Sequence, residues 1–146
     1  MQKTLKIVAI FIVMAFISQF DYAQLPIVWQ KSYGGSGQEY PTAIIQTNEG
    51  GYAVVGYTNS SASGDITGSR SNYYDYWLVK LSSSGSIEWQ QYYGGTNHDK
   101  ATAVAQTNDG GFAIVGYVES SNGQVTGHHG GQDFWVVQTN STGVLQ

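Results

Sequence analysis

The 146-residue chain contains no cysteine, only two prolines and few charged residues, which make up 11% of its length. Because it has no cysteine, it can form neither disulfides nor thiolate metal sites, and apolar burial must stabilise the fold. Basic residues are scarce as well, since six lysines and arginines stand against ten carboxylates. A mildly acidic chain without a basic stripe does not suit a polyanion, so we expect no nucleic-acid partner.

Long hydrophobic runs are also missing, apart from one near the N-terminus. Ile7 to Ile17 are eleven consecutive apolar residues that follow two lysines. This run is too short to span a bilayer, which takes about 20 residues, and its pattern is typical of an export signal. We therefore expect residues 1–23 to be a signal-peptide helix, removed after Ala23 or after Ser18, and the mature protein to be secreted or cell-surface, without a stable membrane span. An uncleaved anchor is the alternative.

Aromatic residues and glycine are abundant: aromatics make up 14% of the chain and glycines number 19. Aromatic side chains favour strands, and glycine favours tight turns. We therefore expect an all-β protein with an apolar and aromatic core, to which the four tryptophans contribute.

The second half of the chain repeats the first. Gln46 to Ser61 recurs as Gln106 to Ser121, with 11 of 16 positions identical. The same offset relates Trp29 to Trp89, whereas Asp75 recurs as Asp133, so one loop is slightly shorter in the second copy. A fixed period of this length is the signature of a repeat architecture.

Each copy contains four short strand candidates separated by turn signals. In the second copy, Asn108 to Gly111 offers residues that tolerate a positive φ, as a tight hairpin requires. The run Phe112 to Val118 is apolar on both alternating faces, so both faces of its sheet must be covered. The expected strands of this copy are about Ala101–Thr107, Phe112–Val118, Phe134–Thr139 and a fourth that begins at Val144.

These copies divide the chain into segments. We expect an orphan outer strand and its connection at residues 24–41, a first unit at 42–100 and a second, truncated unit at 101–146. Ile27 to Tyr33 matches the fourth strand of a unit whose first three strands are absent, and the register of the second unit predicts a tryptophan just after Gln146. Both ends therefore predict that the natural protein continues.

Four short motifs carry a resemblance to a known repeat family. They are Trp-Gln-Lys-x-Tyr-Gly-Gly-Ser from Trp29, the Asn-Glu/Asp-Gly-Gly-Tyr/Phe hairpins, Thr-Gly at Thr67 and Thr126, and Asp-Tyr/Phe-Trp-x-Val from Asp75 and Asp133. Together they resemble the repeats of secreted bacterial β-propeller repeat proteins, which often end in a type IX secretion sorting domain. A smaller part, Gly85 followed by Trp89, is similar to the tryptophan-docking unit of quinoprotein-like propellers. The resemblance implies two tandem four-stranded antiparallel blades of a partial β-propeller.

The tryptophans recur at equivalent places inside apolar strands, Trp29 with Trp89 and Trp77 with Trp135. This recurrence favours a structural role, in which each ring fills the space between blades and its indole N–H bonds to a neighbouring carbonyl. Sugar-stacking platforms are the alternative.

Binding residues are expected in the two longer loops, 61–74 and 120–132, which differ most between the copies. Variable loops on a repeated scaffold are where binding specificity usually lies. The first loop carries Arg70, Tyr73 and Tyr74, which suit contacts with carbohydrate or protein.

The second loop carries His128 and His129. Adjacent histidines in an extended segment point to opposite sides, so they do not chelate one ion unaided. The aspartates and asparagines of the repeats are expected to cap turns, with calcium binding as the alternative. No nucleophile with a base and no phosphate-binding loop is found, so we expect neither a catalytic residue, a metal nor a cofactor.

The chain is therefore expected to be a non-enzymatic scaffold outside the cytoplasm that binds a protein or a glycan. One alternative is a fragment of a propeller-based, carbohydrate-active enzyme whose active centre lies in blades outside this chain. Another is an open repeat array that serves as a spacer in a surface fibre.

Overall fold

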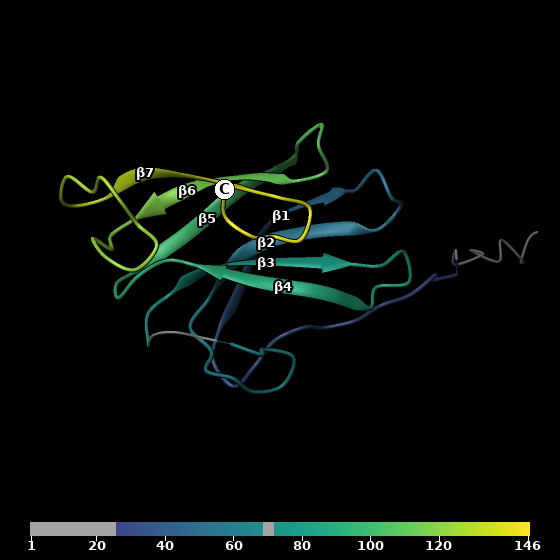
Figure 1. Cartoon of the computed structure of the whole chain (residues 1–146). Coiled ribbons are helices and arrows are strands. Elements are labelled where there is room, and N and C mark those ends of the chain that lie inside the picture. The colour runs from purple at the N-terminus through teal and green to yellow at the C-terminus, as the bar shows by residue number, and fades with distance from the viewer. Residues whose placement is uncertain (1–25, 69–71) are drawn as a thin grey trace, which may run out of the picture.

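The computed structural model describes residues 26–68 and 72–146, and its regular elements there are all strands (Figure 1). They are β1 (Glu39–Gln46), β2 (Tyr52–Thr58), β3 (Asp75–Leu81), β4 (Ile87–Tyr93), β5 (Asp99–Gln106), β6 (Phe112–Val118) and β7 (Asp133–Thr139). The prediction of an all-β protein is confirmed for this part of the chain. The predicted signal peptide, residues 1–23, lies outside the described residues.

The strands form two open antiparallel sheets. The first sheet has the order β1-β2-β3-β4 and the second has β5-β6-β7. The expected four strands are therefore present in the first sheet, whereas the second has three. After the turn at 140–143, the predicted fourth strand contributes only an isolated bridge between Thr139 and Leu145.

The two sheets pair their strands in the same register. Glu39 lies opposite Thr58 in the first sheet, and Asp99 lies opposite Val118 in the second. On both strands, the residue of the second sheet follows its counterpart in the first sheet by the same number of positions. Both first strands also carry an irregularity at the same place, next to Pro41 and next to Ala101. Such bulges bend a strand and increase its twist, so the two sheets have the same local shape where they meet.

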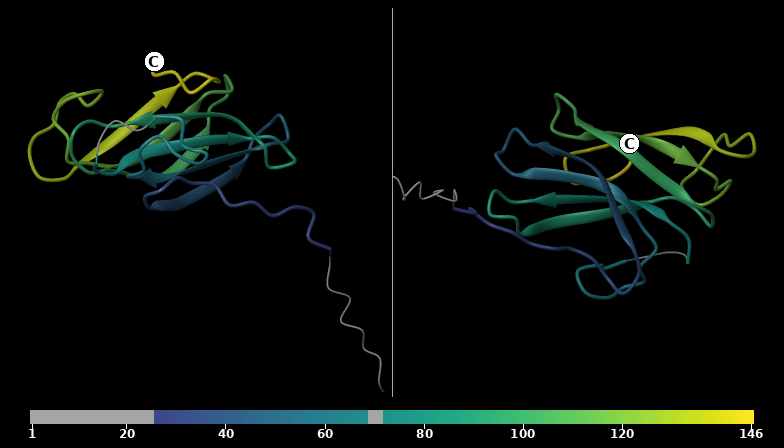
Figure 2. Two further views of the ribbon diagram at one scale, coloured as in Figure 1. Left: turned by 90° about the horizontal axis from the view of Figure 1, so that it is seen from below. Right: turned by 180° about the vertical axis from the view of Figure 1, so that it is seen from behind.

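The core lies between the two sheets, which lie against each other in Figure 2. We call the face of each sheet that carries Val55, or its repeat counterpart Val115, the forward face, and the opposite face the rear face. The forward face of the first sheet packs on the rear face of the second, and β5 contacts β1, β2 and β3. The forward face contributes Ala53, Val55, Tyr76, Leu78 and Tyr93, and the rear face contributes Ala101, Phe112, Ile114 and Val137, all buried. Burial of this apolar area is the main source of stability in a chain without disulfides.

The outward faces differ in how they are covered. On the rear face of the first sheet, Trp77, Val79 and Leu81 are buried beneath Tyr33 and Ile66. On the forward face of the second sheet, Phe134 is 92% exposed. The second sheet therefore presents an apolar face to solvent.

The orphan strand predicted at Ile27 to Tyr33 is not a strand in the structure, because the segment forms no ladder with a neighbour. It docks on the first sheet through side chains instead. The Trp29 indole donates a hydrogen bond to the carbonyl of Ser83 at 3.0 Å, and the Tyr33 hydroxyl donates to the carbonyl of Gly85 at 2.5 Å.

The same docking recurs between the two sheets. Tyr93 on β4 donates to the carbonyl of Gly143 at 2.7 Å, as Tyr33 does to that of Gly85. The rings of Trp89 and Phe112 are 5.7 Å apart at 67°. Those of Trp29 and Tyr52, the equivalent positions of the first copy, are 5.8 Å apart at 66°. Residues 29–33 do not form a strand, but they occupy on the first sheet the place that β4 occupies on the second.

This docking requires glycine at position 143. Gly143 has a φ of 77°, and a Cβ atom there would lie 2.8 Å from the Trp89 ring. Gly110 has a similar φ of 83°, but the nearest neighbour of its Cβ would be 3.7 Å away. The two positions thus separate the cost of the backbone conformation from the cost of crowding.

We expect Gly110→Ala to lower the free energy of unfolding by about 1 kcal/mol, because only the left-handed conformation is penalised. Gly143→Ala should cost about 1–3 kcal/mol more, because it also overpacks the contact with Trp89. Urea denaturation of the two variants measures the difference. Equal losses would contradict the docking role of this turn.

Candidate ligand-binding site: a tyrosine–lysine cluster between the sheets

Five side chains from both sheets gather at the junction of the two units. Tyr40 and Lys100 are the second residues of the first strand of each sheet, and Tyr57 and Tyr117 lie directly opposite them on the second strands. Tyr74 precedes β3. We call these five residues the tyrosine–lysine cluster; its members meet because the first strand of each sheet begins at the edge where the second strand ends.

The tyrosine rings of the cluster contact one another. Tyr40 and Tyr57 are stacked, with centroids 5.1 Å apart and planes at 24°. Tyr74 meets both rings edge-on, at 5.7 Å from Tyr40 and 5.2 Å from Tyr57. Contacts of this geometry contribute about 0.5–1.5 kcal/mol each beyond buried area, so the rings hold each other in place.

Lys100 lies among the rings. Its ammonium is 5.3 Å from the centroid of Tyr57, 5.0 Å from that of Tyr74 and 5.8 Å from that of Tyr117. These distances are those of cation–π contacts. The hydrogen bond with the Tyr117 hydroxyl raises the pKa of Lys100, so the cluster carries a positive charge at neutral pH.

Polar groups and one further ring border the cluster. The Tyr74 hydroxyl donates to Gln38 Oε1 at 2.5 Å, and its backbone N–H donates to His98 Nδ1 at 3.3 Å. Partial burial raises the pKa of the Tyr74 hydroxyl, which therefore stays a donor. Tyr73 meets the His98 ring edge-on at 5.0 Å. The site thus combines ring faces with hydrogen-bonding groups.

A buried carboxylate fixes the backbone beneath Lys100. Asp99 accepts hydrogen bonds from the N–H of Gly95 at 2.8 Å and from the hydroxyl of Ser120 at 2.7 Å. It also accepts from the N–H groups of Glu119 and Ser120. In the first unit, Glu39 accepts from the hydroxyls of Thr58 and Ser60. These bonds tie each first strand to the loop that follows the second strand, and so preorganise the site.

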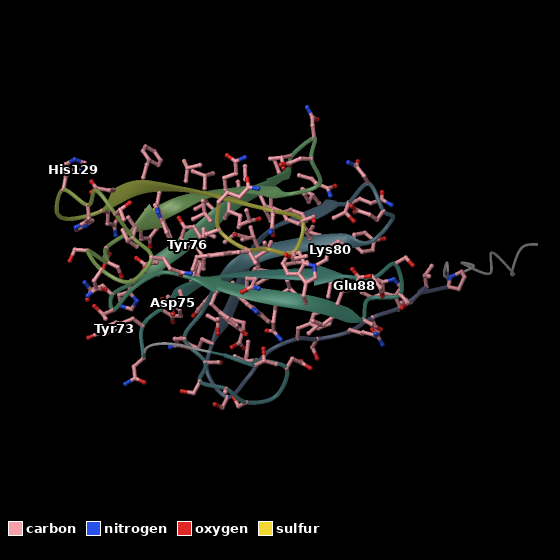
Figure 3. All side chains as sticks on the ribbon, in the orientation of Figure 1. Tyr73, Asp75, Tyr76, Lys80, Glu88 and His129 are labelled. Atoms are coloured by element: carbon pink, nitrogen blue, oxygen red, sulfur yellow. The ribbon has the colours of Figure 1, made fainter. Side chains whose placement is uncertain are left out.

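The structure brings only part of the predicted binding set together. Tyr74 belongs to the cluster and Tyr73 borders it, while Arg70 lies outside the described residues. His128 and His129 lie in the other loop, where the ring of His129 is 3.5 Å from a carboxylate oxygen of Asp133. Figure 3 shows His129 and Tyr73 at well-separated places on the same end of the molecule.

The tryptophans lie away from this site. Trp89 and Trp135 pack against the core between the sheets, and Trp77 is buried on the rear face of the first sheet. The indole of Trp77 donates to Gln90 Oε1 at 3.0 Å, and that of Trp29 donates to a backbone carbonyl.

Four members of the cluster, Tyr40, Tyr57, Lys100 and Tyr117, were missed by the sequence analysis. A signal for them exists in the repeat itself. Between the two copies Tyr57 recurs as Tyr117, whereas Tyr40 is replaced by Lys100. On a repeated scaffold, a position whose residue type differs between the copies, next to a position whose residue type is the same in both, is a candidate for determining ligand specificity.

Within residues 26–68 and 72–146, no three histidine, aspartate or glutamate side chains are grouped so that they could hold a metal ion. Two aspartates considered for calcium bond within their own turns. The Thr107 hydroxyl lowers the pKa of Asp109, and the backbone N–H of His129 lowers that of Asp133. In the same part of the chain no helix is long and apolar enough to cross a membrane.

Comparisons with known proteins add no relative. No protein-family profile matches the chain, and no curated protein matches it significantly. The function must therefore be argued from the site.

Proposed function

We propose that this chain is a non-enzymatic scaffold of propeller-like units, exported from the cell, that binds a glycan at the tyrosine–lysine cluster. The observation that carries the proposal is the exposure of two rings at a preorganised junction. Tyr40 is 42% exposed and Tyr73 is 46% exposed, although both belong to a network of ring contacts. Exposed aromatic rings that gather at one place, instead of being scattered singly, are a feature of ligand-binding surfaces.

The chemistry of the cluster suits a carbohydrate. A sugar ring has apolar C–H faces, which pack on aromatic rings, and a rim of hydroxyls, which need hydrogen-bonding partners. The cluster and its border offer the partly exposed rings of Tyr40 and Tyr73 beside the polar groups of Gln38, His98 and Lys100. A mostly aromatic surface with a few placed polar groups is the usual composition of a small-molecule site. The charge of Lys100 favours glycans that carry carboxylate groups.

The test is a glycan array with neutral and acidic glycans, followed by titration calorimetry with the best oligosaccharide. We expect Tyr40→Ala and Tyr73→Ala each to weaken binding about tenfold, because each removes an exposed ring. Tyr40→Phe is the matched control, since it keeps the ring and should change affinity by no more than about twofold. Lys100→Met should weaken binding of acidic glycans more than that of neutral ones.

Two outcomes would contradict this proposal. One is undiminished glycan binding by the Tyr40→Ala and Tyr73→Ala variants, which would place the site elsewhere. The other is release of cleaved sugar during the titration, which would favour a carbohydrate-active enzyme instead. If the array shows no binding while an extracellular protein is captured through these tyrosines, the ligand is a protein.

A further inference from the structure

Tyr74 is held at two points by equivalent residues of the two units. Its hydroxyl donates to Gln38 Oε1 at 2.5 Å, and its backbone N–H donates to His98 Nδ1 at 3.3 Å. Gln38 and His98 occupy the same place in the repeat, one residue before the first strand of each sheet. Their backbones are also bonded alike, since the Gln38 carbonyl accepts from Asn59 and the His98 carbonyl accepts from Glu119. Each unit therefore fixes one end of Tyr74.

His98 also contacts the rings at the end of the first long loop. Its ring lies 5.0 Å from that of Tyr73, which meets it edge-on, and 5.3 Å from that of Tyr74. Beside these contacts, the backbone N–H of Asp99 donates to the Tyr74 carbonyl at 2.6 Å. The segment before β5 thus positions both rings, and its bond from Tyr74 to Nδ1 is the contact that a proton can remove.

The bond to His98 requires an unprotonated Nδ1, because only a ring nitrogen without a hydrogen accepts a hydrogen bond. A second proton on the imidazole would occupy this atom and turn the acceptor into a donor that faces the N–H of Tyr74. Histidine takes up such a proton within the range of about pH 5 to 8, where an amide side chain does not titrate. Acidification therefore releases Tyr74 from His98 and not from Gln38.

The charges around His98 act in both directions. Carboxylates favour a charged imidazole, and three of them belong to residues beside this bond: Asp75 after Tyr74, Asp99 after His98, and Glu119, whose backbone N–H donates to the His98 carbonyl. The Lys100 ammonium, 5.0 Å from the Tyr74 ring centroid, opposes that charge. The tyrosine rings that face the imidazole carry no charge in this pH range.

We propose that His98 is a positioning residue of the ligand site, and that its protonation releases Tyr74 and weakens ligand binding below about pH 6. Tyr74 meets Tyr40 and Tyr57 edge-on, so its release loosens the ring network of the cluster. The role of His98 rests on the proposed function, because the rings that it positions belong to the surface offered to the glycan. A glycan is then held at neutral pH and released in an acidified medium.

NMR spectra of the backbone amides of the unliganded chain, recorded between about pH 8 and pH 5, test the release of Tyr74. We expect its amide resonance to move with the midpoint at which the His98 imidazole takes up its proton. In His98→Gln the resonance should stay in place, because glutamine offers an acceptor that does not titrate, as Gln38 does in the first unit. His129→Gln is the matched control, since it removes a histidine from the other loop and should leave the movement unchanged.

Titration calorimetry at about pH 7.5 and about pH 5.5 tests the effect on binding. The probe is the neutral oligosaccharide that binds best on the glycan array, because an acidic one would be attracted by the added charge. We expect the affinity of the unsubstituted chain to fall about fivefold at the lower pH, the effect of one lost hydrogen bond. His98→Gln should bind equally at both values, whereas His98→Leu, which offers no acceptor, should bind weakly at both.

Two results would overturn the role of His98. One is a Tyr74 resonance that moves in His98→Gln as it does in the unsubstituted chain, or that moves in neither. The other is an affinity that falls with pH to the same extent in both chains, or in neither. A chain whose Tyr74 resonance titrates through His98 but that binds no glycan would contradict the proposed function and not the release of Tyr74.

Discussion

We expect replacement of Trp89 by alanine to lower the free energy of unfolding by about 3 kcal/mol, the lower end of the cost of removing a large aromatic side chain from a core, because Trp89 is only partly buried. Trp89 lies on β4, where its ring meets Phe112 edge-on at 5.7 Å and packs against the turn at Gly143. Removal of the indole opens a cavity between the two sheets, and no disulfide limits the resulting loosening. A loss of this size is a large part of the stability of a small domain.

Phe134→Ala is the control for this prediction, because it also removes an aromatic ring from a strand. Its side chain is exposed, so the change should stay within about 0.5 kcal/mol in dilute solution. Urea denaturation followed by far-ultraviolet circular dichroism measures both variants. Similar losses for Trp89→Ala and Phe134→Ala would mean that contact between the sheets does not stabilise the fold.

The second large effect is expected at alkaline pH. Burial raises the pKa of Tyr76 and of Tyr93 above the ordinary value of 10.0. The folded chain therefore holds these two protons after the unfolded chain has begun to release them. Their contribution to stability is complete below pH 10 and is lost as pH rises above that value. The slope reaches at most about 1.4 kcal/mol per pH unit for each tyrosine.

The measurement is the free energy of unfolding at several values between about pH 8 and pH 11. Tyr76→Phe and Tyr93→Phe should each flatten the alkaline decline, because each removes one of the two protons. At neutral pH, Tyr93→Phe should cost about 1 kcal/mol, since it loses the hydrogen bond to the Gly143 carbonyl. A decline that keeps its full slope in both variants would assign the effect to other groups.

The strands of the second unit were predictable because their pattern is local. Phe112 to Val118 was expected as a strand and forms β6 with the same bounds, and Phe134 to Thr139 is β7 apart from one residue at its start. Alternation of side chains and glycine-rich turns are properties of neighbouring residues. The shorter second loop was also predicted correctly, since it falls at residues 119–132, between β6 and β7.

Structural features that depend on residues far apart in the sequence were harder to predict. Ile27 to Tyr33 has the sequence of a fourth strand but forms none, because a strand is defined by the strand beside it. Trp77 and Trp135 occupy equivalent positions, yet Trp77 packs with a loop residue and with Tyr92 of its own sheet, whereas Trp135 packs against the core between the two sheets. Their local sequences do not show this difference.

The tyrosine–lysine cluster was missed for the same reason. Tyr40 and Lys100 belong to different copies of the repeat and are far from either longer loop in the sequence. Only the registers of β1 with β2 and of β5 with β6 place Tyr57 and Tyr117 opposite them. Loop reasoning found Tyr73 and Tyr74 because they lie in a segment that varies between the copies, whereas the other members lie in the strands that the copies share.

The docking of an aromatic pair on a glycine turn also bears on how such a chain can lengthen. Gly85, which receives Trp29, and Trp89, which packs at Gly143, are close neighbours in the sequence. Both halves of the contact are therefore encoded in one short stretch of DNA. A duplicated unit would therefore carry both a glycine turn that receives an aromatic pair and an aromatic pair that packs on the next glycine turn. The new unit could dock on its neighbours without further mutation, as in other arrays that are stabilised by contacts between adjacent repeats.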